Sequence, residues 1–200
     1  MGFMQSASGD GNFKVFVKYN AKAGRFYTKK DEKDAPEFEV TNLTAVFDMD
    51  NLKTGWFLFA PSVAPVKSFN PDMETWIPSP GEGFKRGFEL DLFSEKNLLG
   101  VREFSSTASV VIDAMNELYD NWMAAPESSA NKLPVVKCAG VLPVVNKHGT
   151  NYQPQFAIVG WVDRPAELGG VAAQKQETKP APPPAAKAPE PVGADDDVEF

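Results

Sequence analysis

Basic and aromatic side chains are interleaved in residues 14–30 of this 200-residue chain, and together they could hold a single-stranded nucleic acid. In such sites the bases stack on aromatic rings, each contributing about 1–3 kcal/mol, and cations meet the phosphates. Phe16 carries most of this argument, because strand alternation puts it on the same face as Lys14 and Lys18. If the lysines are solvated, Phe16 is solvated too, and an exposed ring between cations suits a stacked base. If both faces of the strand are partly buried, Phe16 belongs to the core instead.

Two further regions could add rings and cations to the same surface. Segment 55–59 is an alternating aromatic run, and the loop 68–85 is rich in proline and aromatic residues. A long loop of this kind is either a functional flap or a segment packed on itself. The candidates for base stacking are Phe16, Tyr19, Phe26, Tyr27, Trp56 and Trp76. The candidates for phosphate contact are Lys14, Lys18, Lys22, Arg25, Lys29, Lys30, Lys85 and Arg86.

The residue types that catalysis requires are not brought together by any motif in this sequence. With one histidine, His148, and one cysteine, Cys138, the chain cannot form a zinc site of the usual kind. The glycine-rich stretch 81–87 precedes an expected strand rather than a helix, so it does not match a phosphate-binding loop. Asp48 and Asp50 share one face of a strand, where two carboxylates are usually solvated. We therefore expect a protein that is not an enzyme and that uses no metal and no cofactor.

The hydrophobic pattern predicts nine strand segments and one helix. Strands are expected at 12–19, 25–30, 37–47, 55–60, 63–69, 87–93, 98–104, 133–145 and 155–162. The helix is expected between a cap at Ser105 or Ser106 and a stop at Pro126. Its apolar face would contain Val111, Met115, Leu118 and Trp122. This pattern predicts a mainly β fold: a partly open, OB-like barrel with elaborated hairpins and one amphipathic helix.

The C-terminal part of the chain has a different composition. Residues 169–193 are mostly Ala and Pro with scattered charged residues, too little apolar surface to offset the entropy of ordering. The chain then ends in an acidic tip with a terminal aromatic ring: Asp195, Asp196, Asp197, Val198, Glu199 and Phe200. We therefore expect a flexible N-terminus at 1–11, an OB-like single-stranded DNA-binding domain at 12–168, and a disordered linker with its acidic tip at 169–200.

Charge and cysteine usage limit the partners. The net charge is −7; residues 169–200 hold three lysines against six acids, so −3 belongs to this segment and −4 to the body. A basic patch, and not the charge of the whole molecule, must therefore attract a nucleic acid. The lone cysteine suits a reducing compartment, and the longest nearly apolar stretch is too short to span a bilayer. We expect a cytoplasmic protein with no membrane partner.

Body and tip together resemble a bacteriophage single-stranded DNA-binding protein. The tip is similar to that of bacterial SSB, in which a linker leads to consecutive Asp, a hydrophobic residue, Pro and a terminal Phe; here Glu199 stands where Pro is expected. In the body the resemblance rests on the basic aromatic hairpin and the stretches 87–90 and 159–163. It implies coating of single strands in replication or recombination, in the bacterial host cytoplasm if phage-encoded. It also implies a tip that recruits replication or recombination proteins and competes with DNA for the basic groove.

A different class of function is also compatible with the sequence. An aromatic-rich β domain could bind carbohydrate, or it could act as a structural or assembly module with a solubilising tail. Carbohydrate sites use aromatic platforms too, but surround them with carboxylates and amides rather than with a row of lysines. The pattern leaves the oligomeric state open, a homo-oligomer included.

Overall fold

The computed structural model describes residues 14–32, 35–60, 65–147 and 149–170. The fold is mainly β, as predicted, and within the described residues the strands form one curled sheet. The expected flexible N-terminus, most of the expected linker and the acidic tip lie outside the described residues.

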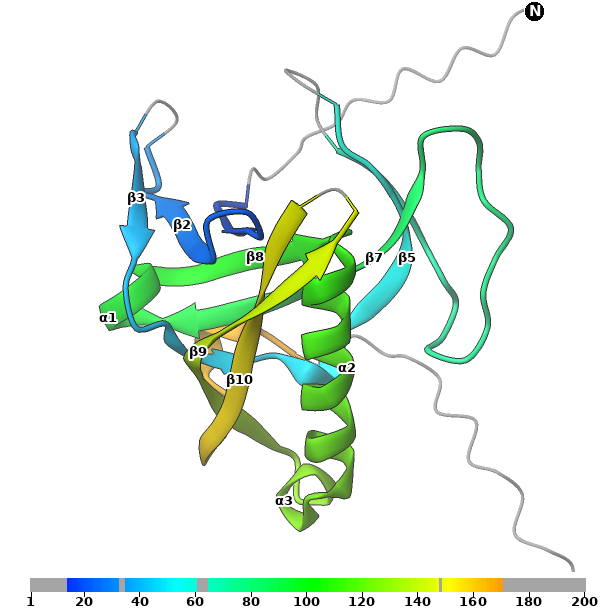
Figure 1. Cartoon of the computed structure of the whole chain (residues 1–200). Coiled ribbons are helices and arrows are strands. Elements are labelled where there is room, and N and C mark those ends of the chain that lie inside the picture. Colours follow the sequence, from blue (N-terminus) through cyan, green and yellow to red (C-terminus); the bar gives the residue numbers. More distant parts are fainter. Residues whose placement is uncertain (1–13, 33–34, 61–64, 148, 171–200) are drawn as a thin grey trace, which may run out of the picture.

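Ten strands lie in the described residues, one more than the pattern predicts, and the last two are longer than expected. They are β1 (Phe16–Asn20), β2 (Arg25–Lys29), β3 (Glu37–Val40), β4 (Thr44–Phe47), β5 (Lys53–Leu58), β6 (Val66–Phe69), β7 (Lys85–Ser94), β8 (Gly100–Ser106), β9 (Lys132–Asn146) and β10 (Gly149–Asp163). The helices in the same residues are α1 (Glu95–Leu98), α2 (Ser109–Ala124) and α3 (Pro126–Ser129), with short 3-10 turns η1 (Met49–Asn51) and η2 (Ala166–Leu168). The long amphipathic helix predicted from the sequence is α2, and Figure 1 shows it beside the β9–β10 hairpin.

The sheet curls almost into a ring without closing. Its strand order is β10-β9-β4-β7-β8-β1-β2-β3, with β5 paired to β7 and β6 added outside β5. Strands β4 and β3 are the two ends of the row β4-β7-β8-β1-β2-β3, and residues 41–43 alone separate them in the chain. The two ends of this row therefore lie near each other, which curls the sheet. The single strand expected at 37–47 is therefore divided by a bend, at which Asn42 takes a positive φ of 54°. This is the predicted partly open arrangement.

Helix α2 packs its apolar face against the inside of this sheet. Val111, Met115, Leu118 and Trp122 are all buried, as the spacing predicts. They join a core that includes Phe47, Leu92 and Phe104. The expected cap is corrected: Ser105 and Ser106 belong to β8, and the residue before the helix is Ala108, which offers no side-chain cap.

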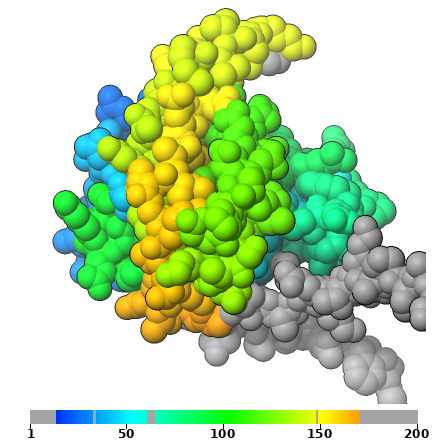
Figure 2. All heavy atoms as spheres, turned by 90° about the horizontal axis from the view of Figure 1, so that it is seen from below, coloured from blue at the N-terminus to red at the C-terminus, as the bar shows by residue number. Residues whose placement is uncertain are grey.

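The tip of the β9–β10 hairpin extends beyond the body, as the yellow arm in Figure 2 shows.

Within the sheet, two glycines allow a close approach between strands. Gly55 on β5 pairs with Gly87 on β7, and a Cβ at Gly55 would lie 2.3 Å from the carbonyl oxygen of Ser68 on β6. A side chain at either position would push these strands apart, so the fold of β5 and β6 over β7 depends on them.

An ion-pair network holds the last described residues against the body. Asp48, 1% exposed, accepts hydrogen bonds at 2.6 and 2.9 Å from the guanidinium of Arg164. Asp50 accepts another from Arg164 at 3.0 Å, and Asn51 donates to Asp48 at 2.8 Å. The pKa of Arg164 is raised, mainly by its hydrogen bond with Asp48. The carboxylate pair singled out in the sequence is thus a structural clamp, with both acids bound to one arginine.

Replacing Arg164 with Ala is expected to destabilise the protein by about 3 kcal/mol, because it leaves the buried Asp48 carboxylate without its cation. Urea denaturation measures the free energy of unfolding. The matched control is Lys132→Ala, which removes an exposed pair with Asp163 at 3.4 Å and should cost less than about 1 kcal/mol. Equal effects of the two substitutions would contradict a structural role for the clamp.

Candidate nucleic-acid interface

The first hairpin presents two different faces. Along β1 and the residues before it, Val15 and Val17 are buried, while Lys14 and Lys18 are exposed and Phe16 is half-buried between them. This alternation follows from burying the valines in the core, since successive side chains of a strand point to opposite faces. The partner strand β2 adds Arg25, Tyr27 and Lys29 to the outer face: Tyr27 lies opposite Lys18, and the Lys29 ammonium lies 6.0 Å from the centre of the Phe16 ring.

A groove runs beside Phe16 on this outer face. It has a volume of about 360 Å³ and lies between β1 on one side and the ends of β5 and β6 on the other, over β8. Phe16 and Phe59 supply rings, and Lys14, Lys18 and Lys67 supply ammonium groups. Phe59 is 46% exposed, and its ring stacks on buried Phe57 at a centroid distance of 6.0 Å. The hollow thus combines accessible rings with cations. In the rest of this article it is called the Phe16 groove.

Most of the lysine and arginine side chains around this groove already form ion pairs with carboxylates. Lys18 donates to Glu37 at 2.6 Å, Arg25 donates to Glu39 at 2.7 Å, and Lys14 donates to Asp91 at 2.8 Å. All three pairs join side chains of the sheet's outer face, and each basic partner is about half exposed. The row of solvated cations inferred from residues 14–30 is therefore a row of ion pairs. Exposed pairs of this kind contribute only about 0–1 kcal/mol each, so a phosphate can replace the carboxylate at little cost.

The most enclosed of these ion pairs involves Lys67 at the wall of the groove. Its ammonium donates at 2.6 Å to Glu89 on β7 and at 2.5 Å to Glu103 on β8, and all three side chains are mostly buried. Burial lowers the pKa of Lys67, but the hydrogen bonds with Glu103 and Glu89 outweigh it and the pKa is raised overall. Lys67 thus ties β6 across β7 to β8 and sets the width of the Phe16 groove.

Two of the aromatic candidates face the interior. Phe26 is 4% exposed and packs against Phe104 and Phe156 in the core, so no base can stack on it and its predicted role is corrected. Tyr19 lies on the same inner face, with its ring 4.6 Å from that of Phe26 and its hydroxyl donating to the carbonyl of Tyr152 at 2.9 Å. Burial raises the pKa of Tyr19. Sequence alternation alone does not say which face of the hairpin is inside, so it could not separate these two rings from the outward ones.

The tryptophan candidates form a separate cluster on the opposite face of β7. Arg86 lies over both rings, 5.5 Å from the centre of Trp56 and 4.6 Å from that of Trp76. The Trp56 indole donates to the carbonyl of Ile77 at 2.8 Å, which fastens the loop after β6 to β5. This cluster borders a hollow of about 350 Å³ against α2. Phe88 lines this hollow, whereas the next residue, Glu89, points to the other side of β7, where Lys67 and the Phe16 groove lie. The tryptophans therefore do not line the Phe16 groove.

The remaining cations are dispersed. Lys22 sits in the β1–β2 turn near the carbonyl of Thr150, and Lys30 is exposed just after β2. Lys85 pairs with Phe57 across β5 and β7 and is exposed on the groove side. The tip residues, Asp195 to Phe200, lie outside the described residues.

Sequence reasoning missed Phe59 and Lys67 in the groove. The alternation of 55–59 indicated that Trp56 and Phe57 face opposite sides, but gave no reason to prefer either side. Lys67 lies in the short strand VKSF, which contains no acidic residue, so its partners Glu89 and Glu103 could not be found from the local sequence. The acidic partners Glu37, Glu39 and Asp91 carry no local signal.

The chain matches no protein-family model, no curated protein and no solved structure. In the described ranges no three His, Cys, Asp or Glu side chains are grouped closely enough to hold a metal ion. A search of the same ranges finds no helix with the length and apolar character to cross a membrane. The site must therefore be interpreted from its own geometry.

Replacing Lys67 with Met is expected to destabilise the protein by about 3 kcal/mol at pH 7, because Glu89 and Glu103 then face each other half-buried without a cation. In the wild type the raised pKa of Lys67 keeps its charge, and its contribution, complete below pH 10.5 and lost only as the pH rises through the folded-state value. Urea denaturation at pH 7 measures the free energy of unfolding, and an unchanged value in the variant would contradict a stabilising role for these ion pairs.

Proposed function

We propose that this protein binds single-stranded DNA with little sequence preference and coats it during replication or recombination. The observation that carries the proposal is the Phe16 groove, in which two accessible phenylalanine rings lie among three ammonium groups. Rings accept any base because every base has a flat face, and ammonium groups accept the repeating phosphates. We propose Phe16 and Phe59 as the stacking residues, with Tyr27 next to them on the same outer face.

The ion pairs around the groove determine how the strand would bind. Each phosphate would take the place of a carboxylate on Lys14, Lys18 or Arg25, so the electrostatic gain per contact is small and the stacked rings supply most of the affinity. If about four phosphates are bound in this way, the logarithm of the affinity falls with the logarithm of the salt concentration with a slope near −3. A slope near zero would contradict phosphate binding.

The acidic tip belongs to the same proposal. The described chain ends at Gly170, whose carbonyl accepts a hydrogen bond from Asn51 at 3.4 Å. Gly170 lines a small hollow together with Lys14 and Lys53, and Lys14 also lines the Phe16 groove. The segment that follows therefore starts beside the groove, and about 30 residues reach roughly 30 Å as a random coil. We propose that the tip competes with DNA for the groove cations and, once displaced, recruits replication or recombination proteins through Phe200.

One observation favours a second function, carbohydrate binding. Glu103 lines the Phe16 groove beside the two rings, and the carboxylates of Asp91 and Glu89 lie on the same face. Acids beside an aromatic platform suit sugar hydroxyls. Anisotropy titrations with labelled oligo-dT and with labelled oligosaccharides separate the two proposals, since each predicts binding of one probe alone.

The double substitution Phe16→Ala and Phe59→Ala is expected to weaken binding of fluorescein-labelled oligo-dT about 30-fold or more, because each stacked base contributes about 1–3 kcal/mol. Fluorescence anisotropy at fixed salt measures the dissociation constant. The matched control is Met123→Ala, which removes another exposed apolar side chain, 56% exposed on α2. Unchanged affinity in the double variant, or an equal loss in the control, would rule out the groove as the binding site.

Deleting residues 194–200 is expected to tighten oligo-dT binding, most clearly at low salt where screening between charges is weak. The same anisotropy titration, run on full-length and shortened protein over a range of salt, checks it. Replacing the three aspartates Asp195, Asp196 and Asp197 by Asn keeps the chain length and serves as the matched variant. Weaker or unchanged binding in both would contradict competition by the tip.

A further inference from the structure

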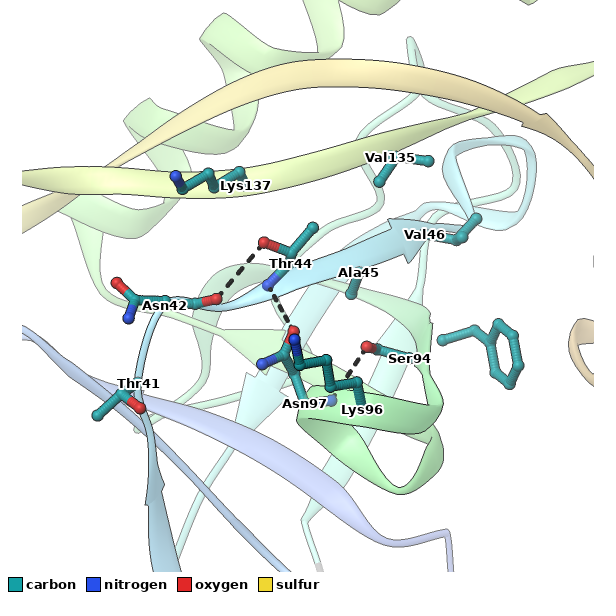
Figure 3. A pocket seen from close by; sticks show the side chains of 11 residues that line it. Thr41, Asn42, Thr44, Ala45, Val46, Ser94, Lys96, Asn97, Val135 and Lys137 are labelled. Atoms are coloured by element: carbon teal, nitrogen blue, oxygen red, sulfur yellow. Dashed lines mark hydrogen bonds between the residues drawn. The ribbon is translucent and has the colours of Figure 1, made fainter.

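A second, larger hollow lies on the sheet away from the Phe16 groove. It has a volume of about 930 Å³ and is bounded by the bend after β3, strand β4, helix α1 and strand β9. None of its lining residues lines the Phe16 groove. Figure 3 shows Lys137 on β9 and Lys96 on α1 on opposite sides of Thr44. The lining residues are Thr41, Asn42, Thr44, Ala45, Val46, Phe93, Ser94, Lys96, Asn97, Val135 and Lys137.

The lysines of this hollow differ from those around the Phe16 groove, because no carboxylate lines the walls beside them. Its walls contain two lysines and no carboxylate. In the part of the chain that the structure describes, neither Lys96 nor Lys137 forms an ion pair, and both side chains are exposed. Both lysines line one hollow without a carboxylate, so an anion bound between them would interact favourably with both ammonium groups.

The polar groups between the lysines are held in place by the backbone. Asn97 accepts a hydrogen bond from the backbone N–H of Thr44 at 3.3 Å, which joins α1 to β4. Its own backbone N–H donates to the Ser94 hydroxyl at 3.2 Å. Lys137 is the cross-strand partner of Thr44, so its side chain starts from the adjacent position of β9. Because Asn97 uses its oxygen for Thr44, its NH₂ group is left as a hydrogen-bond donor (Figure 3).

We infer that this hollow is an oxyanion site that takes a phosphate group, bound by Lys96 and Lys137 with a hydrogen bond from the Asn97 amide; the Thr44 hydroxyl already donates to the carbonyl of Asn42. Ammonium and amide donors match the acceptor-only oxygens of a phosphate, and hydrogen bonds with a charged partner are the strong ones. The volume exceeds that of a single phosphate and leaves room for the attached sugar. We call it the Lys96–Lys137 site.

The same phosphate chemistry can come from two sources. One is the backbone of a single strand that continues past the Phe16 groove; in this form the inference rests on the proposed function and adds a second contact to it. The other is a free phosphate ester, and in this form the site stands without DNA binding.

The experiment is an NMR titration of the full-length, ¹⁵N-labelled protein with inorganic phosphate, with a short oligo-dT and with a long one. The expected result is a shift of the Thr44 and Asn97 amide signals with at least one of these probes. The double variant Lys96→Gln and Lys137→Gln should weaken that binding about tenfold or more, because hydrogen bonds to charged groups contribute about 1.5–3 kcal/mol each. Lys132→Gln, on the same strand β9 but paired with Asp163, is the matched control and should bind like the wild type.

The outcomes separate the site from the proposed function. Shifts with inorganic phosphate but not with oligo-dT support the site and count against DNA binding. Shifts with the long oligo-dT alone, at Thr44 as well as at Phe16, support both and assign the phosphate to the strand. Shifts at Phe16 without any at Thr44 overturn the site and leave the proposed function intact. No shift with any probe, or an equal loss in the Lys132 variant, also overturns the site.

Discussion

The alternation of side chains along the curled sheet is the constraint on which the rest of the structure depends. Burying Val17, Leu90 and Phe104 inside the sheet, against α2, forces their neighbours onto the outer face. On β1 those neighbours are Phe16 and the lysines on either side of it, and on β7 and β8 they are acids. The Phe16 groove and its ion pairs are therefore both consequences of how the core is packed.

The two hollows on the sheet differ in how their cations are satisfied. Around the Phe16 groove Lys14, Lys18 and Lys67 each form an ion pair with a carboxylate, so their charges are already compensated. A ligand must then exchange one ionic partner for another, and the rings distinguish this place from the rest of the surface. At the Lys96–Lys137 site no carboxylate in the lining neutralises the two ammonium groups. Net charge, −7 for the chain, describes neither hollow.

The sequence was a good guide to elements and a poor one to partners. Strand alternation placed Phe16 with Lys14 and Lys18, and helical spacing placed Met115 and Trp122 in the core, because both depend on local geometry alone. The inward position of Phe26 depends on which face of the hairpin meets the rest of the sheet, which no local pattern contains. The ion pairs around the Phe16 groove join residues separated by 14 to 77 positions, so they follow from topology. The same holds for the Lys96–Lys137 site, assembled from three distant segments.

The parallel pairing of β1 with β8 has a consequence for the order of folding. Phe16 aligns with Glu103, so β1 acquires its neighbour β8 only after Glu103 has been synthesised. Until then β1 and β2 can pair only with each other and with β3, and so small a sheet is marginally stable without the layer that packs against it. Contacts this distant in sequence also slow folding, because the intervening loop must close before the contact is gained. The segment richest in binding features thus completes its pairing only after β8 has been synthesised.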